Sequence, residues 1–206
     1  MNKRIISLVL AWIVLIGAIV VIVGWILDIS VLKSILPIWV TMKFITAVCF
    51  LLSSIIVLIL FKKDKGQITE MLLVVLSFSL LLLMISFFFS LFSGISTGIE
   101  SLFVKEAQGV VRTTIPGVPA VPTMLCFILI GLAGSLYSLN SEKKRVIVVL
   151  GGIVALIGLI AVAGYLIGVP AMYYSFPGYT SMAFHTALFF VLLGVSLSFI
   201  SREVKE

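Results

Sequence analysis

Long apolar runs without a single charged residue alternate with short charged or turn-forming segments along the whole chain. The runs cover residues 5–27, 44–61, 71–99, 123–139 and 146–201, and apolar residues 38–42 extend the second at its start. Each run is continuously apolar, which is typical of a membrane-spanning helix of about 20 residues and not of alternating barrel strands. The last run is too long for one helix and too short for three, and Pro170 and the PGY at 177–179 divide it. The pattern therefore predicts six transmembrane helices.

Composition and charge place these helices in a membrane. Hydrophobic residues make up 62% of the chain and charged residues 11%, whereas a soluble domain carries about 25% charged residues. All basic residues except Lys33, Lys43, Lys105 and Arg112 fall on one side of the predicted helices. Because cytoplasmic loops are enriched in Lys and Arg, we expect a protein of the cell's inner (cytoplasmic) membrane with both termini in the cytoplasm. The net charge of +6 then reflects this asymmetry and contact with membrane lipid, and no nucleic-acid partner is expected.

The chain also repeats itself. When it is shifted by 140 residues, the first predicted hairpin matches the last without a gap, and TMLCF at 123–127 in the middle hairpin matches TAVCF at 46–50 and TALFF at 186–190. The repeats are approximately residues 5–61, 71–140 and 146–201 of a single domain, 1–206. The matched residues of the outer hairpins include Gly24 with Gly164, Trp25 with Tyr165, Pro37 with Pro177, Met42 with Met182, Thr46 with Thr186 and Phe50 with Phe190.

The three hairpins are expected to have the same orientation, because each leaves one side of the membrane and returns to it. Repeats of this kind are related by an axis along the membrane normal. They can close into an all-α, six-helix bundle with pseudo-threefold symmetry. A proline is expected to open each even-numbered helix, where its missing N–H costs nothing. The shared threonines Thr46, Thr123 and Thr186 are expected about two turns deeper, all at one depth.

Three segments of the sequence resemble a known group of proteins: LPIWVTMKFITAVCFLL, PGVPAVPTMLCFILIGLA and YTSMAFHTALFFVLLGVSLSFISRE. They resemble the multi-pass membrane input regions of bacterial and archaeal sensor histidine kinases and diguanylate cyclases, over about residues 24–203. The resemblance implies a signal-input module that acts on a cytoplasmic kinase or cyclase. Members of that group usually continue into PAS, kinase or cyclase domains, whereas this sequence stops at SREVKE. We therefore expect either a longer protein or a separate partner chain.

Two ionisable residues fall inside the repeated phrase, and such residues within a membrane are candidates for function. For Lys43, a ligand role competes with snorkelling to the outer surface or with pairing to Asp28. For His185, the only histidine, a sensing role competes with a structural hydrogen bond to a carbonyl. Aromatic walls with a few polar groups form small-molecule pockets. The sequence predicts an outward-facing ligand pocket, closed on the cytoplasmic side by Gly- and Leu-rich packing and lined by Trp25, Trp39, Lys43, Tyr165, Tyr179 and His185.

No pattern indicates catalysis, a metal site or a cofactor. Cys49, Cys126 and nearby methionines have the chemistry for Cu(I), but neither C-x-x-C nor H-x-x-x-H spacing accompanies them, and such residues are ordinary packing material. No predicted span holds a carboxylate pair or a nucleophile beside a base, so we expect no enzyme. The fifth helix is smooth because of its glycines, with Gly164-x-x-x-Gly168 a close-packing signature, either for packing inside the bundle or for a homodimer. These glycines are Gly151, Gly152, Gly158, Gly164 and Gly168. Residues 97–108 fit a short interfacial helix.

The leading functional hypothesis is a membrane sensor that binds a small ligand between the repeats. Signal transduction would then run through the sixth helix and residues 201–206. A small transporter is the alternative, because three parallel hairpins around a normal axis also describe carriers of the mitochondrial type. A charged substrate is disfavoured, since only Lys43 and His185 lie at depth. A structural subunit of a larger membrane complex is the third hypothesis.

Overall fold

The computed structural model describes residues 2–36, 38–94, 98, 116–139, 143–176 and 178–200. Every regular element in these ranges is helical, so the fold is all-α. The elements are α1 (Lys3–Ile26), α2 (Ser30–Lys33), α3 (Phe44–Leu60), α4 (Gln67–Ser93), α5 (Val121–Leu139), α6 (Lys144–Ile167), the 3₁₀ helix η2 (Pro170–Tyr173) and α7 (Phe184–Ser198). The longer helices follow the apolar runs of the sequence.

Within the described ranges, four helices are long and apolar enough to cross a membrane: α1, α4, α5 and α6. The helices α3 and α7 are also apolar but shorter, with 17 and 15 residues. They are short because the chain runs without helical structure through residues 40–43 and 180–183 before each helix begins. We call these residues the approach segments. All but one of their residues are buried, so the approach segments lie inside the bundle and not over its surface.

The helices α3 and α7 do not begin at the repeated prolines, which corrects the expectation from the sequence for these two. They begin at Phe44 and Phe184, several residues beyond positions 37 and 177. The helix α5 begins at Val121, beyond Pro116, and has a different proline, Pro122, in its first turn. The approach segments stay out of the helices because their backbone groups bond to the preceding loops. The shared threonines are consequently in the first turns, where each is the third residue of its helix.

The helix α4 ends inside the third apolar run. The helix α4 stops at Ser93 because Gly94 has a left-handed backbone (φ 68°) and its N–H donates to Ser90 O over 3.1 Å. Apart from Gly98, the predicted interfacial helix at 97–108 lies outside the described residues, as do residues 37, 177 and 201–206.

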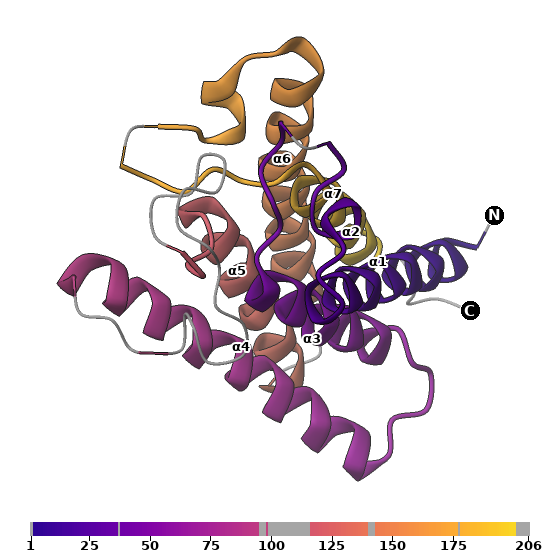
Figure 1. The fold of residues 1–206 in the computed structure, drawn as a ribbon. Coiled ribbons are helices and arrows are strands. Elements are labelled where there is room, and N and C mark those ends of the chain that lie inside the picture. Colours follow the sequence, from indigo (N-terminus) through magenta and orange to yellow (C-terminus); the bar gives the residue numbers. More distant parts are fainter. Residues whose placement is uncertain are drawn as a thin grey trace.

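The long helices pack as three hairpins: α1 with α3, α4 with α5, and α6 with α7. We call them hairpins 1, 2 and 3. Between hairpins, α3 contacts α4, α5 contacts α6, and α7 contacts α1. Hairpin 1 therefore contacts hairpin 2, hairpin 2 contacts hairpin 3, and hairpin 3 contacts hairpin 1. The helices α3, α5 and α7 meet at the centre of the bundle (Figure 1).

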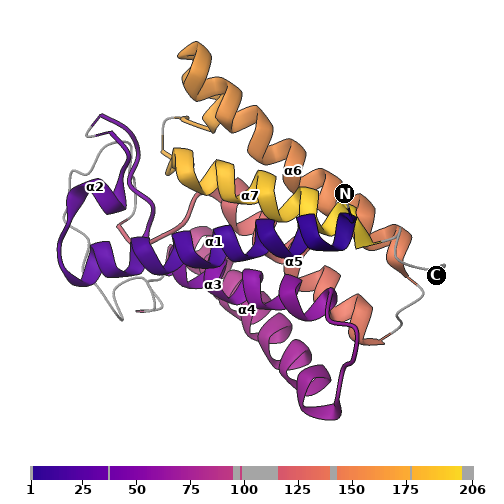
Figure 2. The same ribbon diagram turned by 90° about the vertical axis from the view of Figure 1, so that its right-hand side faces the viewer.

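The two ends of the bundle differ in charge. The start of α1 lies beside the end of α7 (Figure 2), and there the Ser7 and Ser196 hydroxyls each donate to the other residue's carbonyl over 3.3 and 3.1 Å. Arg4 Nε donates to Phe61 O over 2.8 Å, which brings the end of α3 to the same place. We call this end the basic end, since it carries Lys3, Arg4, Lys62, Lys63, Lys65, Lys143, Lys144 and Arg145. The opposite end holds α2, η2 and the approach segments, and we call it the loop end.

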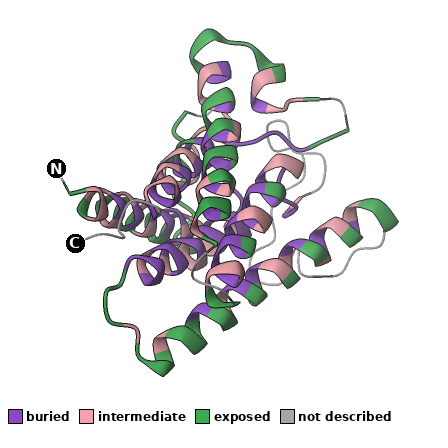
Figure 3. Ribbon diagram, turned by 180° about the vertical axis from the view of Figure 1, so that it is seen from behind, coloured by how far each residue is buried: buried purple, intermediate pink, exposed green. Residues whose placement is uncertain are grey.

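Apolar side chains cover the outer faces of the long helices, as Figure 3 shows by the exposed residues along them. Ile16 in α1, Leu82 in α4 and Leu156 in α6 are 57%, 63% and 57% exposed. Soluble monomers rarely expose contiguous apolar patches of this kind, whereas lipid covers them in a membrane. Together with the four apolar helices, these faces indicate a membrane protein.

Glycine allows the two helices of hairpin 3 to approach closely. A methyl group built on Gly194 would collide with the Ala155 backbone nitrogen and lie 2.6 Å from Gly151 O, and one on Gly158 would lie 2.6 Å from the α7 backbone. Gly152, by contrast, has nothing within 4 Å. The packing role proposed for the glycines therefore holds for Gly151 and Gly158, and the homodimer stays a prediction.

The loops of hairpins 1 and 3 have the same backbone hydrogen bonds at equivalent positions. In both loops the first helix ends in a bond between residues five apart, and a second bond later holds the approach segment. Asp28, the second residue after α1, has a left-handed backbone (φ 55°), and so does its equivalent Gly168 (φ 71°). The paired bonds are Ile29 N to Gly24 O (2.8 Å) with Val169 N to Gly164 O (2.9 Å), and Met42 N to Lys33 O (3.0 Å) with Met182 N to Tyr173 O (3.1 Å).

Side chains of the first helix also hold each approach segment. Trp25 Nε1 donates to Met42 O over 2.9 Å, and the Tyr165 hydroxyl donates to Met182 O over 2.8 Å. An indole and a phenol thus make the same bond at positions that the sequence repeat pairs. The two loops therefore share their architecture as well as part of their sequence.

Candidate functional site

A small polar cavity lies at the loop end, where the first turns of α3, α5 and α7 meet. Each helix contributes one threonine to its wall: Thr46, Thr123 and Thr186. The sequence placed these three threonines at one depth, and they do line one space. The cavity has a volume of about 10 Å³, which is close to the space of one water molecule. The rest of the wall consists of Thr41, Met42, Lys43, Pro119, Ala120, Thr180, Ser181 and Ala183.

Among the described residues that line this cavity, Lys43 alone carries a charge. It is 3% exposed, so the side chain does not snorkel to the surface. The equivalent positions in the other repeats are Ala120 and Ala183, which also line the cavity. Because alanine side chains are small, Lys43 is the one long side chain among these three equivalent positions of the cavity wall.

Asp28, which the sequence offered as a partner for Lys43, forms an ion pair at the loop surface with Lys33 (Nζ to Oδ1, 2.5 Å). The hydrogen bond from Lys33, and secondarily its charge, lower the pKa of the Asp28 carboxyl below 3.8. Lys33 Nζ also lies 4.8 Å from the centre of the Trp25 ring, a cation–π contact. Among the residues that the structure describes at the loop end, this exposed ion pair belongs to the turn after α1.

An aromatic triangle closes the bundle axis one turn beyond the threonines. Phe50, Phe127 and Phe190 are fully buried and touch one another, with ring centres 4.7 to 4.9 Å apart. Each follows its threonine by four residues, so the two side chains lie on one helix face. The sequence predicted Gly- and Leu-rich packing below the pocket, and the structure has phenylalanine at this level. We call these three residues the phenylalanine triangle.

A second aromatic cluster joins hairpins 1 and 3 at the loop end. The Trp39 ring lies 5.0 Å from the Tyr165 ring and 4.8 Å from the Phe184 ring, centre to centre. The rings of Tyr165 and Phe184 are 5.5 Å apart and nearly perpendicular. Tyr173 stacks on Tyr165 at 4.1 Å. Of the six residues predicted to line one pocket, Trp39 and Tyr165 are therefore in contact.

The other four predicted residues lie in different surroundings. Lys43 lines the cavity, Trp25 holds the first approach segment, and Tyr179 is 53% exposed. His185 is the second residue of α7 and is 7% exposed. A single pocket that contains all six residues stays a prediction.

The His185 imidazole lacks a hydrogen bond of good geometry at either nitrogen among the described residues. The backbone of Lys33 is nevertheless near enough to interact with the ring as a hydrogen-bond partner, and the Phe189 ring lies edge-on at 6.4 Å. Both the structural hydrogen bond to a carbonyl and the sensing role of His185 stay predictions.

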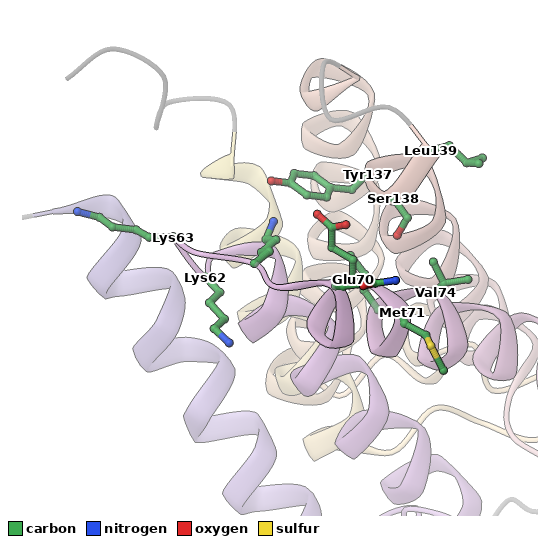
Figure 4. Close-up of a pocket in the computed structure, with 11 residues that line it drawn as sticks. Lys62, Lys63, Glu70, Met71, Val74, Tyr137, Ser138 and Leu139 are labelled. Atoms are coloured by element: carbon green, nitrogen blue, oxygen red, sulfur yellow. The ribbon is translucent and has the colours of Figure 1, made fainter.

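A larger open groove of about 1040 Å³ lies at the basic end, between the α3–α4 connection and the end of α5. Lys65 Nζ lies 3.7 Å from the centre of the Tyr137 ring and donates to Leu60 O over 3.2 Å. Figure 4 shows that Lys62 and Lys63 extend away from Tyr137 and Glu70. Its wall consists of Lys62, Lys63, Lys65, Gln67, Glu70, Met71, Leu73, Val74, Tyr137, Ser138 and Leu139.

The described part of the chain contains no group of three or more His, Cys, Asp or Glu side chains that could hold a metal ion. Cys49 and Cys126 are buried free thiols. Each directly precedes a member of the phenylalanine triangle in sequence.

The cavity hydroxyls and the phenylalanine triangle were not among the predicted site residues. A signal for both exists in the sequence, because TAVCF, TMLCF and TALFF share a threonine and a phenylalanine four residues apart. That spacing puts both side chains on the helix face that turns toward the axis. Ser181 carries no comparable signal, since it precedes α7 in a segment whose conformation depends on the loop.

No protein-family model, curated protein or solved structure matches the chain.

Proposed function

We propose that the chain is the signal-input module of a membrane sensor, with six transmembrane passes and the loop end on the outer side. It binds a small ligand at the loop end and acts on a cytoplasmic kinase or cyclase through α7. The observation that carries this proposal is a polar cavity at the loop end that the phenylalanine triangle separates from the basic end. Such a cavity supports binding of a ligand and not its passage.

The lengths of α3 and α7 support the six passes. At about 1.5 Å per residue, 17 and 15 helical residues span about 25 and about 23 Å. Each approach segment adds about 13 Å if its four residues are extended at about 3.3 Å each. The sums exceed the hydrocarbon thickness of about 30 Å. A helix with its approach segment therefore has the length of one pass.

Two further observations support three hairpin repeats around an axis. Each hairpin contacts the other two through one helix pair, so the three hairpins form a closed ring. The equivalent residues Phe50, Phe127 and Phe190 meet at its centre. The equivalent hydrogen bonds of the loops in hairpins 1 and 3 add to this support.

The helix α7 is the element best placed to relay a signal. Its first turn contributes Thr186 to the cavity, and its last turn reaches the basic end, where Ser196 bonds to Ser7 of α1. Packed helices shift as rigid bodies by about 1–2 Å in many regulated proteins. A ligand that displaces the first turn of α7 would therefore move its last turn as well.

The orientation can be tested by labelling single cysteines in intact cells with a membrane-impermeant maleimide. We expect Tyr179→Cys at the exposed loop end to react and Lys63→Cys at the basic end to be protected. The background is favourable because Cys49 and Cys126 are buried. Reaction at Lys63→Cys with protection at Tyr179→Cys would reverse the proposed orientation.

The binding function can be tested by screening small polar molecules for thermal stabilisation of the purified chain. We expect a stabilising compound to act on the wild type and on Thr69→Val, a control at the basic end, and to lose its effect on Thr186→Val. The same compound should not be taken up by liposomes that contain the protein. Uptake above that of empty liposomes would favour the transporter instead, and equal stabilisation of Thr186→Val would place the site elsewhere.

A further inference from the structure

The open groove at the basic end has walls of two kinds. The α3–α4 connection contributes Lys62 and Lys63, whereas the first turns of α4 and the end of α5 contribute apolar side chains such as Met71 and Leu139. Met71 is 68% exposed and Leu139 is 81% exposed. Ammonium groups are stabilised by anions, and apolar side chains by hydrocarbon. A ligand that covers both walls therefore needs an anionic group and a hydrocarbon part in one molecule.

The basic wall of the groove is positively charged. Among the described residues of the wall, three are lysines and Glu70 is the acidic one, while Asp64 of the same connection does not line the groove. Lys62 and Lys63 extend away from Glu70 (Figure 4), so this carboxylate does not pair with them. Lys62 Nζ donates to Thr69 Oγ1 over 3.2 Å, which uses one of the three donors of an ammonium group. Clustered lysines of this kind attract the anionic headgroups of a membrane surface.

The groove lies at the level where the hydrocarbon of a membrane meets the headgroups. It includes the first turns of α4 and the last turn of α5, and both helices are long and apolar enough to cross a membrane. Tyr137 lines the groove, and tyrosine is enriched at the membrane–water interface. Lysine side chains near helix ends extend toward the headgroups. The apolar wall therefore lies at the depth of the upper acyl chains, and the lysines lie at the depth of the phosphates.

The size of the groove favours a lipid over a free phosphate. Its volume of about 1040 Å³ is at the upper end of small-molecule sites, and a free phosphate would leave Met71 and Leu139 exposed to water. We propose that the groove binds an anionic phospholipid of the surrounding leaflet, with the phosphate on Lys62 and Lys63 and an acyl chain along Met71 and Leu139. The inference rests on the membrane placement alone, because lipid binding requires neither a ligand in the cavity nor an output partner.

Phosphatidylglycerol is the probe for this proposal. The purified full chain in detergent micelles is titrated with phosphatidylglycerol or with phosphatidylcholine, and the retained lipid is measured by native mass spectrometry. We expect the wild type to bind phosphatidylglycerol several-fold more tightly than phosphatidylcholine. The double variant Lys62→Gln/Lys63→Gln should bind phosphatidylglycerol about tenfold more weakly, because two charged partners are lost. The control Lys143→Gln/Arg145→Gln removes two exposed charges of the same end outside the groove wall and should behave like the wild type.

The apolar wall is tested separately. Leu139→Ser should weaken phosphatidylglycerol binding several-fold, whereas Ile68→Ser, at a position that is 86% exposed and outside the wall, should not. Both positions are exposed, so the fold should tolerate both changes. Glycerol phosphate should not displace the lipid, because it has the phosphate but no acyl chain.

Four results would overturn the lipid site. They are equal affinity of the wild type for the two lipids, equal weakening by the two double variants, equal effects of Leu139→Ser and Ile68→Ser, and displacement of the lipid by an equal concentration of glycerol phosphate. None of them bears on the loop end, so the compound screen and its liposome control would still support or reject the sensor on their own.

Discussion

Hairpins 1 and 3 have the same loop architecture built from different side chains. Trp25 and Tyr165 make the same bond to an approach segment, and Asp28 and Gly168 have the same left-handed backbone. The comparison teaches that this connection depends on a few backbone bonds and one anchoring donor. The chemistry of the anchor is free to vary as long as a donor reaches the carbonyl.

The helix pairs of the two hairpins differ more than their loops. Hairpin 3 has glycine at 151, 158 and 194, where the equivalent residues of hairpin 1 are Ala11, Ala18 and Ser54. The glycines bring the backbones of α6 and α7 into contact, and hairpin 1 has a side chain at each of these positions. Hairpin 3 should therefore tolerate added volume poorly, and hairpin 1 should tolerate it better.

The largest effect is expected when hairpin 3 receives the residue of hairpin 1. Gly194→Ser would place its Cβ against the backbone of Ala155 and Gly151, which cannot move aside as a flexible side chain could. We expect a loss of about 3 kcal/mol in the free energy of unfolding, measured by denaturant titration in micelles. Gly152→Ser, with open space around it, should change stability by less than about 0.5 kcal/mol. Equal losses in both variants would contradict close packing of α6 on α7.

A smaller effect is expected from removing the anchoring donors. Tyr165→Phe leaves the Met182 carbonyl without the phenol donor in a buried site, so we expect a loss of about 1–2 kcal/mol. Trp25 is half-buried, and water can replace its indole N–H more easily, so Trp25→Phe should lose less through the hydrogen bond. The part due to the bond can be separated by comparing hydrogen exchange of the loop amides with global unfolding. If Tyr165→Phe is as stable as the wild type, the phenol bond does not hold the approach segment.

The left-handed positions should respond unequally to exchange. Gly168→Asp forces a side chain onto a φ of 71°, and we expect a loss of about 1 kcal/mol. Asp28→Gly relieves the same strain in hairpin 1 but removes the exposed ion pair with Lys33, so its net change should be smaller than the loss in Gly168→Asp. Thermal unfolding of both variants tests the difference. A larger loss for Asp28→Gly than for Gly168→Asp would show that the ion pair outweighs the backbone.

The smallest effect is a pH dependence that only hairpin 1 should show. The pKa of Asp28 is lowered in the folded chain, first by the hydrogen bond from Lys33 and then by its charge. A carboxyl whose pKa is lowered by folding stabilises the fold above its unfolded pKa, and this contribution disappears as the pH falls through the folded pKa. Stability should therefore decrease slightly more for the wild type than for Asp28→Asn below a pH of about 3.8. Parallel pH profiles of the two proteins would mean that the exposed pair contributes nothing.

Much of the helix content could be predicted from the apolar runs. The end of α1 and the division between α6 and α7 follow from where apolar residues stop and where prolines occur. The starts of α3 and α7 could not be predicted, because residues 40–43 and 180–183 are largely apolar or small and fit a helix equally well. Their conformation depends on hydrogen bonds to Lys33 and Tyr173, which only the folded loop provides.

The candidate site was predicted in part for a similar reason. Lys43 stood out because a charge in an apolar run has few explanations, and it does line a cavity. The aromatic residues Trp39 and Tyr165 were selected for their type, and they pack on each other and on Phe184. Phe50 was part of the repeated phrase, but a phenylalanine in an apolar run has many ordinary roles. Its place on the axis becomes visible only when three helices are considered together.

The phenylalanine triangle also bears on whether protons could leak across a membrane through this bundle. A membrane that stores an ion gradient loses it wherever water molecules form a continuous file along which protons can hop. Hydroxyl groups and a lysine at the loop end would begin such a file. In the described part of the chain, three rings at 4.7 to 4.9 Å from one another occupy the axis below these groups, and ring carbon neither donates nor accepts a proton. The bundle can therefore keep a wet polar site on one side and still act as an electrical insulator.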